Sequence, residues 1–178
     1  MGRFAITALL LSCPAAWGET PQPNPAASVP ADCKAAEYRQ LDFWIGRWRV
    51  LNTTDKVEYA SSSIEPIAHS CGVKETYESP KAPSGPYIGT SYSAFDRKDG
   101  HWHQMYVDSN GSVTQYSGGP QDGGMVFEAV GDRAMQRMTY RLQPDASVRQ
   151  IGQFSTDGGK TWQPGYDYTY QKENNLGR

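Results

Sequence analysis

Apolar and polar residues alternate with a period of two along most of the chain after Gly46. This alternation is typical of half-buried β-strands. Short turn sequences rich in Gly, Asp, Asn and Pro separate nearly every pair of the strands that it predicts. The predicted strands are residues 46–52, 57–68, 71–79, 87–96, 101–108, 112–118, 124–130, 135–142, 147–155 and 161–171.

The connections between these strands are too short to hold crossover helices, which excludes a parallel sheet built from βαβ units. Consecutive strands joined by tight turns form an antiparallel meander. A meander of this length normally closes on itself, because closure removes its unpaired edges. We therefore predict an all-β fold, an antiparallel up-and-down barrel of about ten strands.

The segment "CKAAEYRQLDFWIG" precedes the strands and has a different pattern. Tyr38, Leu41 and Ile45 follow the spacing of one apolar helical stripe. Asp32 fits the N-cap position and Gly46 fits the end of a helix. The pattern predicts one short N-terminal helix that plugs or flanks one end of the barrel.

The first eighteen residues have the layout of a cleaved secretory signal: a basic start, the apolar run "FAITALLLS" and small residues at Ala16 and Gly18. The run is shorter than the about 20 residues that span a bilayer. An alternative is a lipoprotein signal with Cys13 lipidated. Cleavage leaves a Pro-rich linker at residues 19–31, the barrel domain at 32–171 and a tail at 172–178. The sequence thus predicts a periplasmic or secreted protein.

Cys33 and Cys71 remain after the signal is removed. An even pair of cysteines in an exported chain predicts a disulfide. The bridge would close a loop of nearly forty residues, which stabilises the fold by about 4 kcal/mol through loop-closure entropy.

The net charge of the full chain is −2, and loss of Arg3 with the signal makes it −3. Nucleic-acid binding needs clustered basic residues, so we expect no nucleic-acid partner. No second hydrophobic segment follows the signal, so we expect no membrane span. The oligomeric state does not follow from the sequence.

The stretch "STDGGKTW" at residues 155–162 resembles the Asp-box hairpin of sialidases and other β-propellers. It occurs once, and the chain has strands for only about two propeller blades. We therefore interpret it as a turn, in which Ser155 and Asp157 accept hydrogen bonds from backbone amides and Trp162 folds over the glycines. We expect no sialidase activity.

The stretch "LDFWIGRWRV" contains Gly46-x-Trp48, which resembles the Gly-x-Trp signature of lipocalin and calycin barrels. Together with Cys71, "HWHQMYVDSNG", "SVRQ" and "STDGGKTW…YDYTY", it resembles a family of uncharacterised secreted bacterial proteins with a lipocalin-like barrel, distantly similar to nitrobindin-like proteins. The resemblance implies the barrel and export. It also implies that the glycine permits a tight strand start and that the tryptophan closes one barrel end. It implies no activity.

The nitrobindin-like relatives raise haem as a cofactor, and their proximal histidine lies in the last strands. This chain has Tyr166, Tyr168 and Tyr170 there and no histidine. A tyrosine phenolate is an alternative iron ligand. We expect no cofactor.

His101 and His103 lie two residues apart, so they share one strand face about 6.6 Å apart along the strand. They form half of a metal site that His69 or Glu75 would complete. The alternative is that both histidines face solvent. We expect no metal.

A barrel of this size holds one small ligand. We expect an exported protein that binds a small hydrophobic or amphipathic molecule. The candidate ligand-binding residues are Trp102, Gln104, Tyr106, Tyr140 and Trp162. Arg137, Arg141 and Arg149 would balance an acidic ligand if one of them points inward.

Two other functions stay open. The first is a barrel enzyme, either a metal-assisted hydrolase on His101 and His103 or an isomerase- or cyclase-like enzyme. The second is a module whose aromatic outer surface binds another protein. The usual nucleophile motifs of hydrolases do not occur in the sequence, so we name no catalytic residue.

Overall fold

The computed structural model describes residues 33–82, 85–130 and 135–173, all within one compact unit that comprises residues 31–178. The predicted signal, linker and Asp32 cap lie outside the described residues. Most of the predicted tail does too, although the last strand extends through Lys172. No helix among the described residues is long and apolar enough to cross a membrane.

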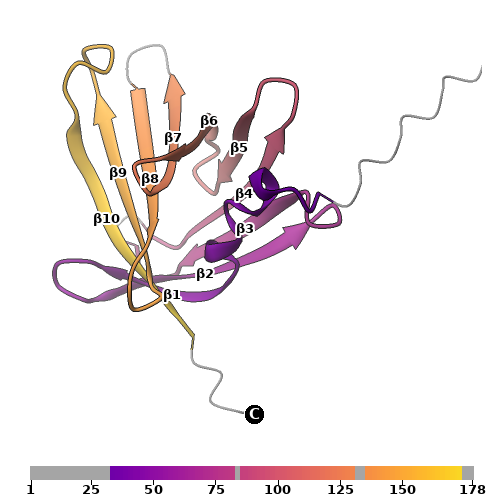
Figure 1. The fold of residues 1–178 in the computed structure, drawn as a ribbon. Helices are drawn as coiled ribbons and strands as arrows, with labels where there is room; N and C mark the ends of the chain where they lie inside the picture. Colours follow the sequence, from indigo (N-terminus) through magenta and orange to yellow (C-terminus); the bar gives the residue numbers. More distant parts are fainter. Residues whose placement is uncertain (1–32, 83–84, 131–134, 174–178) are drawn as a thin grey trace, which may run out of the picture. The chain divides into compact units, whose positions relative to one another are not determined.

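Ten strands form a closed barrel in which each strand pairs antiparallel with its neighbours in sequence and β1 pairs with β10 (Figure 1). The predicted all-β, up-and-down barrel is therefore confirmed. The strands are β1 Gly46–Asn52, β2 Glu58–Ile67, β3 Gly72–Ser79, β4 Tyr87–Asp96, β5 His101–Asp108, β6 Val113–Gln121, β7 Gly124–Val130, β8 Met135–Leu142, β9 Val148–Ser155 and β10 Gln163–Lys172.

The two ends of the barrel differ. Because consecutive strands run in opposite directions, the β1–β2, β3–β4, β5–β6 and β9–β10 connections lie at one end, which we call the open end. The β2–β3, β4–β5, β6–β7 and β8–β9 connections lie at the other end, which we call the closed end, together with the N-terminal segment 33–45.

The N-terminal segment forms two short 3-10 turns, η1 Ala36–Arg39 and η2 Asp42–Trp44, where the sequence predicts one helix with an α-helical stripe. Backbone bonds from Tyr38 to Ala35 and from Trp44 to Leu41, both 3.0 Å, have three-residue spacing. In a 3-10 helix side chains three residues apart lie on one face. Tyr38, Leu41 and Trp44 are accordingly buried, and Trp44 takes the place predicted for Ile45.

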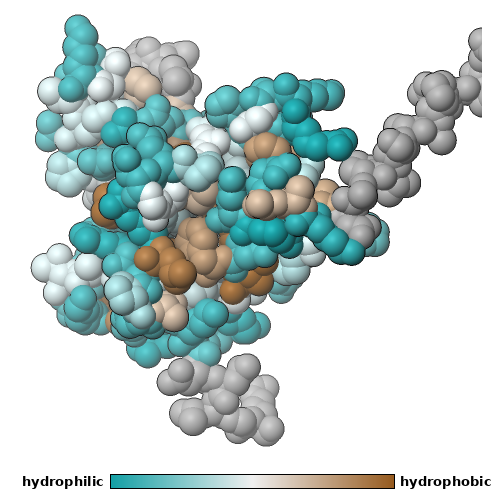
Figure 2. All heavy atoms as spheres, in the orientation of Figure 1, coloured by the Kyte–Doolittle hydropathy of each residue, from teal (hydrophilic) through white to brown (hydrophobic). Residues whose placement is uncertain are grey.

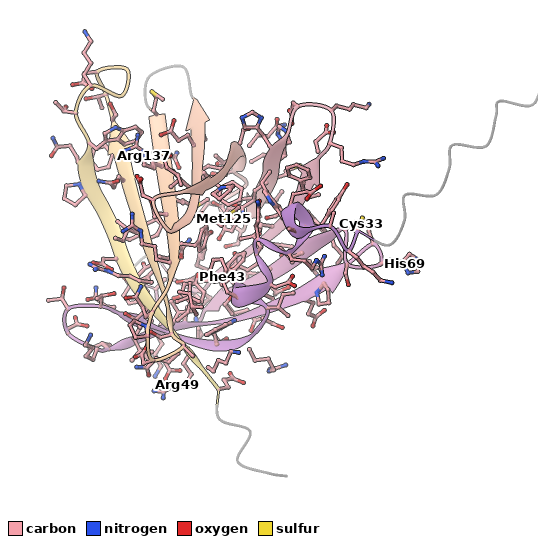
Figure 3. All side chains as sticks on the ribbon, viewed as in Figure 1. Cys33, Phe43, Arg49, His69, Met125 and Arg137 are labelled. Atoms are coloured by element: carbon pink, nitrogen blue, oxygen red, sulfur yellow. A yellow bond between two sulfur atoms is a disulfide. The ribbon has the colours of Figure 1, made fainter. Side chains whose placement is uncertain are left out.

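The predicted disulfide between Cys33 and Cys71 is present, with Cα atoms 5.1 Å apart. It ties the N-terminal segment to the β2–β3 turn. A hydrogen bond from the Arg39 guanidinium to the Ser70 carbonyl joins the same two parts. Figure 3 shows Cys33 and His69 together at this turn, away from Arg137 on β8.

Gly46 and Trp48 close the barrel at this end. Gly46 has φ +149°, a conformation that residues with a side chain rarely adopt. The Trp48 ring is fully buried and its Nε1 donates to the Trp44 carbonyl at 2.9 Å. Trp102 on β5 is also buried, and its Nε1 donates to Gln40 Oε1 at 2.9 Å. The N-terminal segment is thus fastened to the barrel interior by tryptophan rings.

Strand β6 ends three residues later than predicted, at Gln121 instead of residue 118, and includes the "GGP" that reads as a turn in the sequence. The turn consists of Asp122 and Gly123, whose φ values are +50° and +75°. Two positive φ values in succession fit a two-residue hairpin turn, for which Asp-Gly is a preferred sequence.

The face of the molecule shown in Figure 2 is mainly hydrophilic, with hydrophobic residues gathered near its centre.

Candidate ligand cavity

A cavity of about 450 Å³ occupies the open half of the barrel, within the range of about 300–1,000 Å³ typical of small-molecule sites. Residues of the β3–β4 and β5–β6 connections border it, which places its mouth at the open end. Its lining consists of Tyr59, Glu75, Tyr77, Ser79, Ala82, Tyr87, Gln104, Tyr106, Asp108, Ser112, Thr114, Tyr116, Gln136, Met138, Tyr140, Gln150, Tyr166, Tyr168 and Tyr170.

Tyrosine dominates this lining: nine of the eleven tyrosines of the chain contribute to it. Every second residue of a strand faces inward, so tyrosines with the same parity on several strands meet in the interior. Gly152 makes room for one of them, because a Cβ at this position would lie 2.2 Å from Cε1 of Tyr166 on the paired strand. The cavity is lined by aromatic rings that carry hydroxyl groups.

The inner end of the cavity is a hydrogen-bonded cluster around Glu75, which we call the floor. Ser62 Oγ donates to Glu75 Oε1 at 2.8 Å, and Tyr170 OH lies 3.3 Å from the same oxygen. Tyr170 OH also lies 2.8 Å from Gln150 Oε1, and Gln150 Nε2 donates to Tyr140 OH at 2.9 Å. Side chains from β2, β3, β8, β9 and β10 thus share one polar network.

Glu75 is 4% exposed, and burial raises its pKa to about 7. Hydrogen bonds from Ser62 and Tyr170 lower the pKa but do not offset the loss of hydration. The Glu75 carboxyl therefore exchanges a proton near neutral pH. Among the described residues, Glu75 makes no salt bridge, so its charged form has no cationic partner.

The mouth of the cavity carries a second polar group. Tyr87 OH and Tyr106 OH lie 2.8 Å apart, and Tyr87 OH donates to Asp108 Oδ2 at 3.4 Å. Burial raises the pKa of both tyrosines above the ordinary value. These hydroxyls stay protonated at neutral pH and act as hydrogen-bonding groups.

The structure brings three of the five predicted ligand-binding residues to this cavity: Gln104, Tyr106 and Tyr140. Gln104 Nε2 donates to Ser93 Oγ at 3.0 Å, which leaves its carbonyl oxygen as an acceptor. Trp102 does not line the cavity and belongs to the closed end, where it contacts Phe95.

Trp162, the fifth predicted residue, lies outside the cavity. Its ring packs against Arg137, whose Cζ is 3.8 Å from the ring centroid, and Arg137 forms an ion pair with Glu128. The register of β9 and β10 shifts between Pro164 and Tyr166. Because an inserted residue reverses the facing of the residues on either side, Trp162 does not share the inner face with the strand tyrosines.

The Asp-box stretch forms the expected turn between β9 and β10. Gly159 N donates to Ser155 Oγ and Thr161 N donates to Asp157 Oδ1, both at 2.9 Å. Gly158 and Gly159 have φ values of +73° and +83°. Hydrogen bonds from the Thr161 hydroxyl, the Thr161 backbone N–H and the Ser155 hydroxyl lower the pKa of Asp157 to about 2. The motif organises a hairpin, as its sequence indicates.

His101 and His103 are exposed, whereas Trp102, which lies between them, and Gln104, which follows them, are buried. His103 Nε2 lies 2.8 Å from Asp99 Oδ2. Possible ligand atoms of Asp96, Asp99 and His103 lie within 4.8 Å of one another on this surface. Glu75 lies inside the barrel and His69 in the β2–β3 turn, so neither joins this group.

The three arginines considered for an acidic ligand do not line the cavity. Arg137 pairs with Glu128, Arg149 pairs with Asp167, and Arg141 is exposed. Among the described residues, the polar side chains available to a ligand are therefore carboxyl, amide and hydroxyl groups.

Glu75 is the residue that the sequence interpretation missed as part of a ligand site. A single glutamate in a strand normally faces solvent, and Glu78, three residues on, does so. The available signal was its parity with Tyr77 and Val73, two apolar residues that share its strand face.

The sequence was compared with models of protein families and with curated proteins, and neither comparison found a match.

Proposed function

We propose that this protein binds a small, partly apolar molecule in the open half of its barrel. The observation that carries the proposal is the cavity itself: about 450 Å³ of space inside an otherwise packed barrel, bordered by open-end connections. Ligand sites are typically concave and combine apolar and aromatic side chains with a few directed polar groups.

The chemistry of the lining supports this proposal. Tyrosine rings offer apolar area and a hydroxyl at the same position, so they accommodate an amphipathic molecule. Gln104, Gln150 and Glu75 lie at the inner end, where they can orient the polar part of a ligand. Packing alone would be served better by side chains that fill the space, as the tryptophans do at the closed end.

We also propose that the protein is exported to the periplasm or secreted. The Cys33–Cys71 disulfide supports this location, because disulfides persist mainly in oxidising compartments. N-terminal sequencing of the protein from its own cell fractions tests it. A mature N-terminus at Glu19 in the periplasmic or extracellular fraction is expected, and an uncleaved cytoplasmic chain would contradict it.

Native mass spectrometry of protein isolated from its own cells tests ligand binding directly. We expect an added mass of a few hundred daltons that is released on denaturation. The informative variant is Thr114→Trp, which places an indole in the cavity from β6. Val113→Trp is its matched control, because Val113 is the preceding residue on the same strand and is exposed.

The bound mass is expected in the wild type and in Val113→Trp and should be absent from Thr114→Trp. A ligand retained equally by both variants would show that the cavity is not the binding site. The proposal also fails if no mass is retained and no compound in a screen of amphipathic molecules raises the melting temperature. Ligand at 100 times its Kd adds about 2.7 kcal/mol of stability, which thermal melting detects.

An isomerase-like enzyme is the second candidate, and Glu75 is the observation that favours it. A buried carboxyl with a pKa of about 7 suits proton transfer near neutral pH. Incubation of the co-purified ligand in D2O with wild type and Glu75→Gln separates the two functions. Deuterium incorporated into a C–H position by the wild type alone favours the enzyme. Stoichiometric metal lost in His101→Ala and His103→Ala would instead favour the hydrolase.

A further inference from the structure

The charges around the cavity have one sign. Among the residues that the structure describes, the formally charged side chains in its lining are Glu75 on the floor and Asp108 at the mouth, and no described Lys, Arg or His lines it. The nearby arginines Arg137 and Arg149 instead form ion pairs with Glu128 and Asp167. Within the described lining, an anionic ligand would meet two carboxyl groups and no compensating cation.

The aromatic rings add to this negative character. The face of a tyrosine ring carries a negative partial charge that attracts cations, and aromatic cages bind quaternary ammonium groups in this way. Tyr166 and Tyr168 are stacked 5.0 Å apart, and Tyr77 meets Tyr87 edge to face at 6.0 Å. The cavity therefore presents both ring faces and ring edges between its two carboxyl groups.

Within the described part of the chain, Glu75 lacks the cationic partner that a buried carboxylate normally has. Buried charges in proteins are generally paired, because an isolated charge loses its hydration without compensation. Its hydrogen-bond donors among the described residues are neutral hydroxyls, which include those of Ser62 and Tyr170. A cation at the floor of the cavity would supply the missing countercharge.

We propose that the cavity selects a small organic cation, an amine or quaternary ammonium compound with an apolar or aromatic body, whose charged group pairs with Glu75. The body of this cation lies among the tyrosine rings, and Asp108 attracts it at the mouth. This assignment rests on the proposed small-molecule function and specifies its ligand class.

Binding of such a cation depends on pH. The cation pairs with the ionised form of Glu75, so it displaces the proton that burial retains on this group near neutral pH. Affinity is therefore expected to rise with pH between about 6 and 8 and to level off above that. The hydroxyl groups that face Glu75 stay uncharged in this range, because burial raises the pKa of the tyrosines among them. These groups belong to Ser62 on β2, Tyr77 on β3, Ser91 on β4, Tyr140 on β8, and Tyr166 and Tyr170 on β10.

Isothermal titration calorimetry with three compounds of similar size tests the assignment: 2-phenylethylammonium, 2-phenylethanol and 3-phenylpropanoate. At about pH 8 the cation is expected to bind about tenfold or more tightly than the neutral alcohol, and the anion least tightly. Lowering the pH to about 6 is expected to weaken the cation and leave the alcohol unchanged.

Glu75→Gln is expected to reduce the affinity for the cation to that for the alcohol. Glu78→Gln is the matched control, since Glu78 lies on the same strand with its side chain exposed. Binding of the alcohol as tightly as the cation, or a preference that survives Glu75→Gln, would overturn the cation assignment and leave the ligand cavity in place. Failure of all three compounds to bind at millimolar concentration also overturns the cation assignment. The proposed function is tested separately: it fails if Thr114→Trp and Val113→Trp retain the native ligand equally, or if no ligand is retained and no screened compound raises the melting temperature.

Discussion

The two halves of the barrel interior are built from different aromatic residues. At the closed end Trp44, Trp48 and Trp102 are 0–1% exposed and fill the space between the strands. At the open end nine tyrosines border a cavity of about 450 Å³. The same strands contribute to both halves, since β5 places Trp102 at one end and Tyr106 at the other. One sheet thus holds a packed half and a hollow half.

This difference separates residues that hold the fold from residues available for binding. A tryptophan surrounded by protein on all sides contributes mainly through burial and packing. A tyrosine beside a cavity contacts fewer protein atoms, so its replacement costs less packing energy. Its hydroxyl, however, can contact a ligand. Substitutions at the closed end should therefore change stability, and substitutions at the open end should change binding.

Replacement of a closed-end tryptophan should have the largest effect. Trp48→Ala is expected to lower the free energy of unfolding by about 5 kcal/mol, because it opens a space in a packed core and removes the donor to the Trp44 carbonyl. Tyr168→Ala is the open-end counterpart and should cost about 2 kcal/mol or less, since its half-buried ring already borders the cavity. Urea unfolding of both variants measures the difference, and equal losses would mean that the two halves are packed alike.

Removal of the disulfide should act on stability alone. Cys33→Ser combined with Cys71→Ser is expected to lower the free energy of unfolding by about 4 kcal/mol, because the reduced unfolded chain regains the entropy of a 38-residue separation. The bridge ties down the closed end, so affinity for the phenyl compounds should stay within twofold of the wild type. A large loss of affinity would mean that closed-end anchoring also shapes the cavity.

The pH dependence of stability should report on the floor of the cavity. The native pKa of Glu75 is about 7 and the ordinary value is 4.5, so the native state holds this proton where the unfolded state has released it. Stability is therefore fully present below about pH 4.5 and falls by about 3 kcal/mol as the pH rises to about 7. Glu75→Gln should remove this fall, because its amide does not titrate and Ser62 can still donate to its oxygen. Matching urea midpoints of wild type and variant across this range would contradict the pKa shift of Glu75.

The strands and the disulfide could be predicted from the sequence because their signals are local. The alternation of apolar and polar residues indicates the strands. The interpretation that His101 and His103 face solvent also holds, because the pairing of β5 with its neighbours contains no irregularity. The position of Trp162 was not predicted, because a regular strand was expected over residues 161–171, whereas the register shifts at Pro164 and Gly165, residue types that often mark a bulge.

The floor of the cavity depends on contacts that the sequence does not reveal. Glu75 and Tyr170 are 95 residues apart and meet only because β10 closes the barrel against β1. Four of the five ligand-binding residues predicted from the sequence are aromatic, but strand parity alone cannot separate residues that fill space from residues that border it. Trp102 and Tyr106 have the same parity on one strand and lie in different halves.

The most direct test of this division is nuclear magnetic resonance of protein with isotope-labelled tyrosine rings and tryptophan indoles, titrated with 2-phenylethylammonium. Tyrosine signals from the cavity should shift with a common Kd, while Tyr38 at the closed end and Tyr92 on the outer surface should stay unchanged. The indole signals of Trp44, Trp48 and Trp102 should change little. Shifts centred on Tyr92 or on the closed-end indoles, with the cavity tyrosines unmoved, would contradict the assignment of binding to the open half.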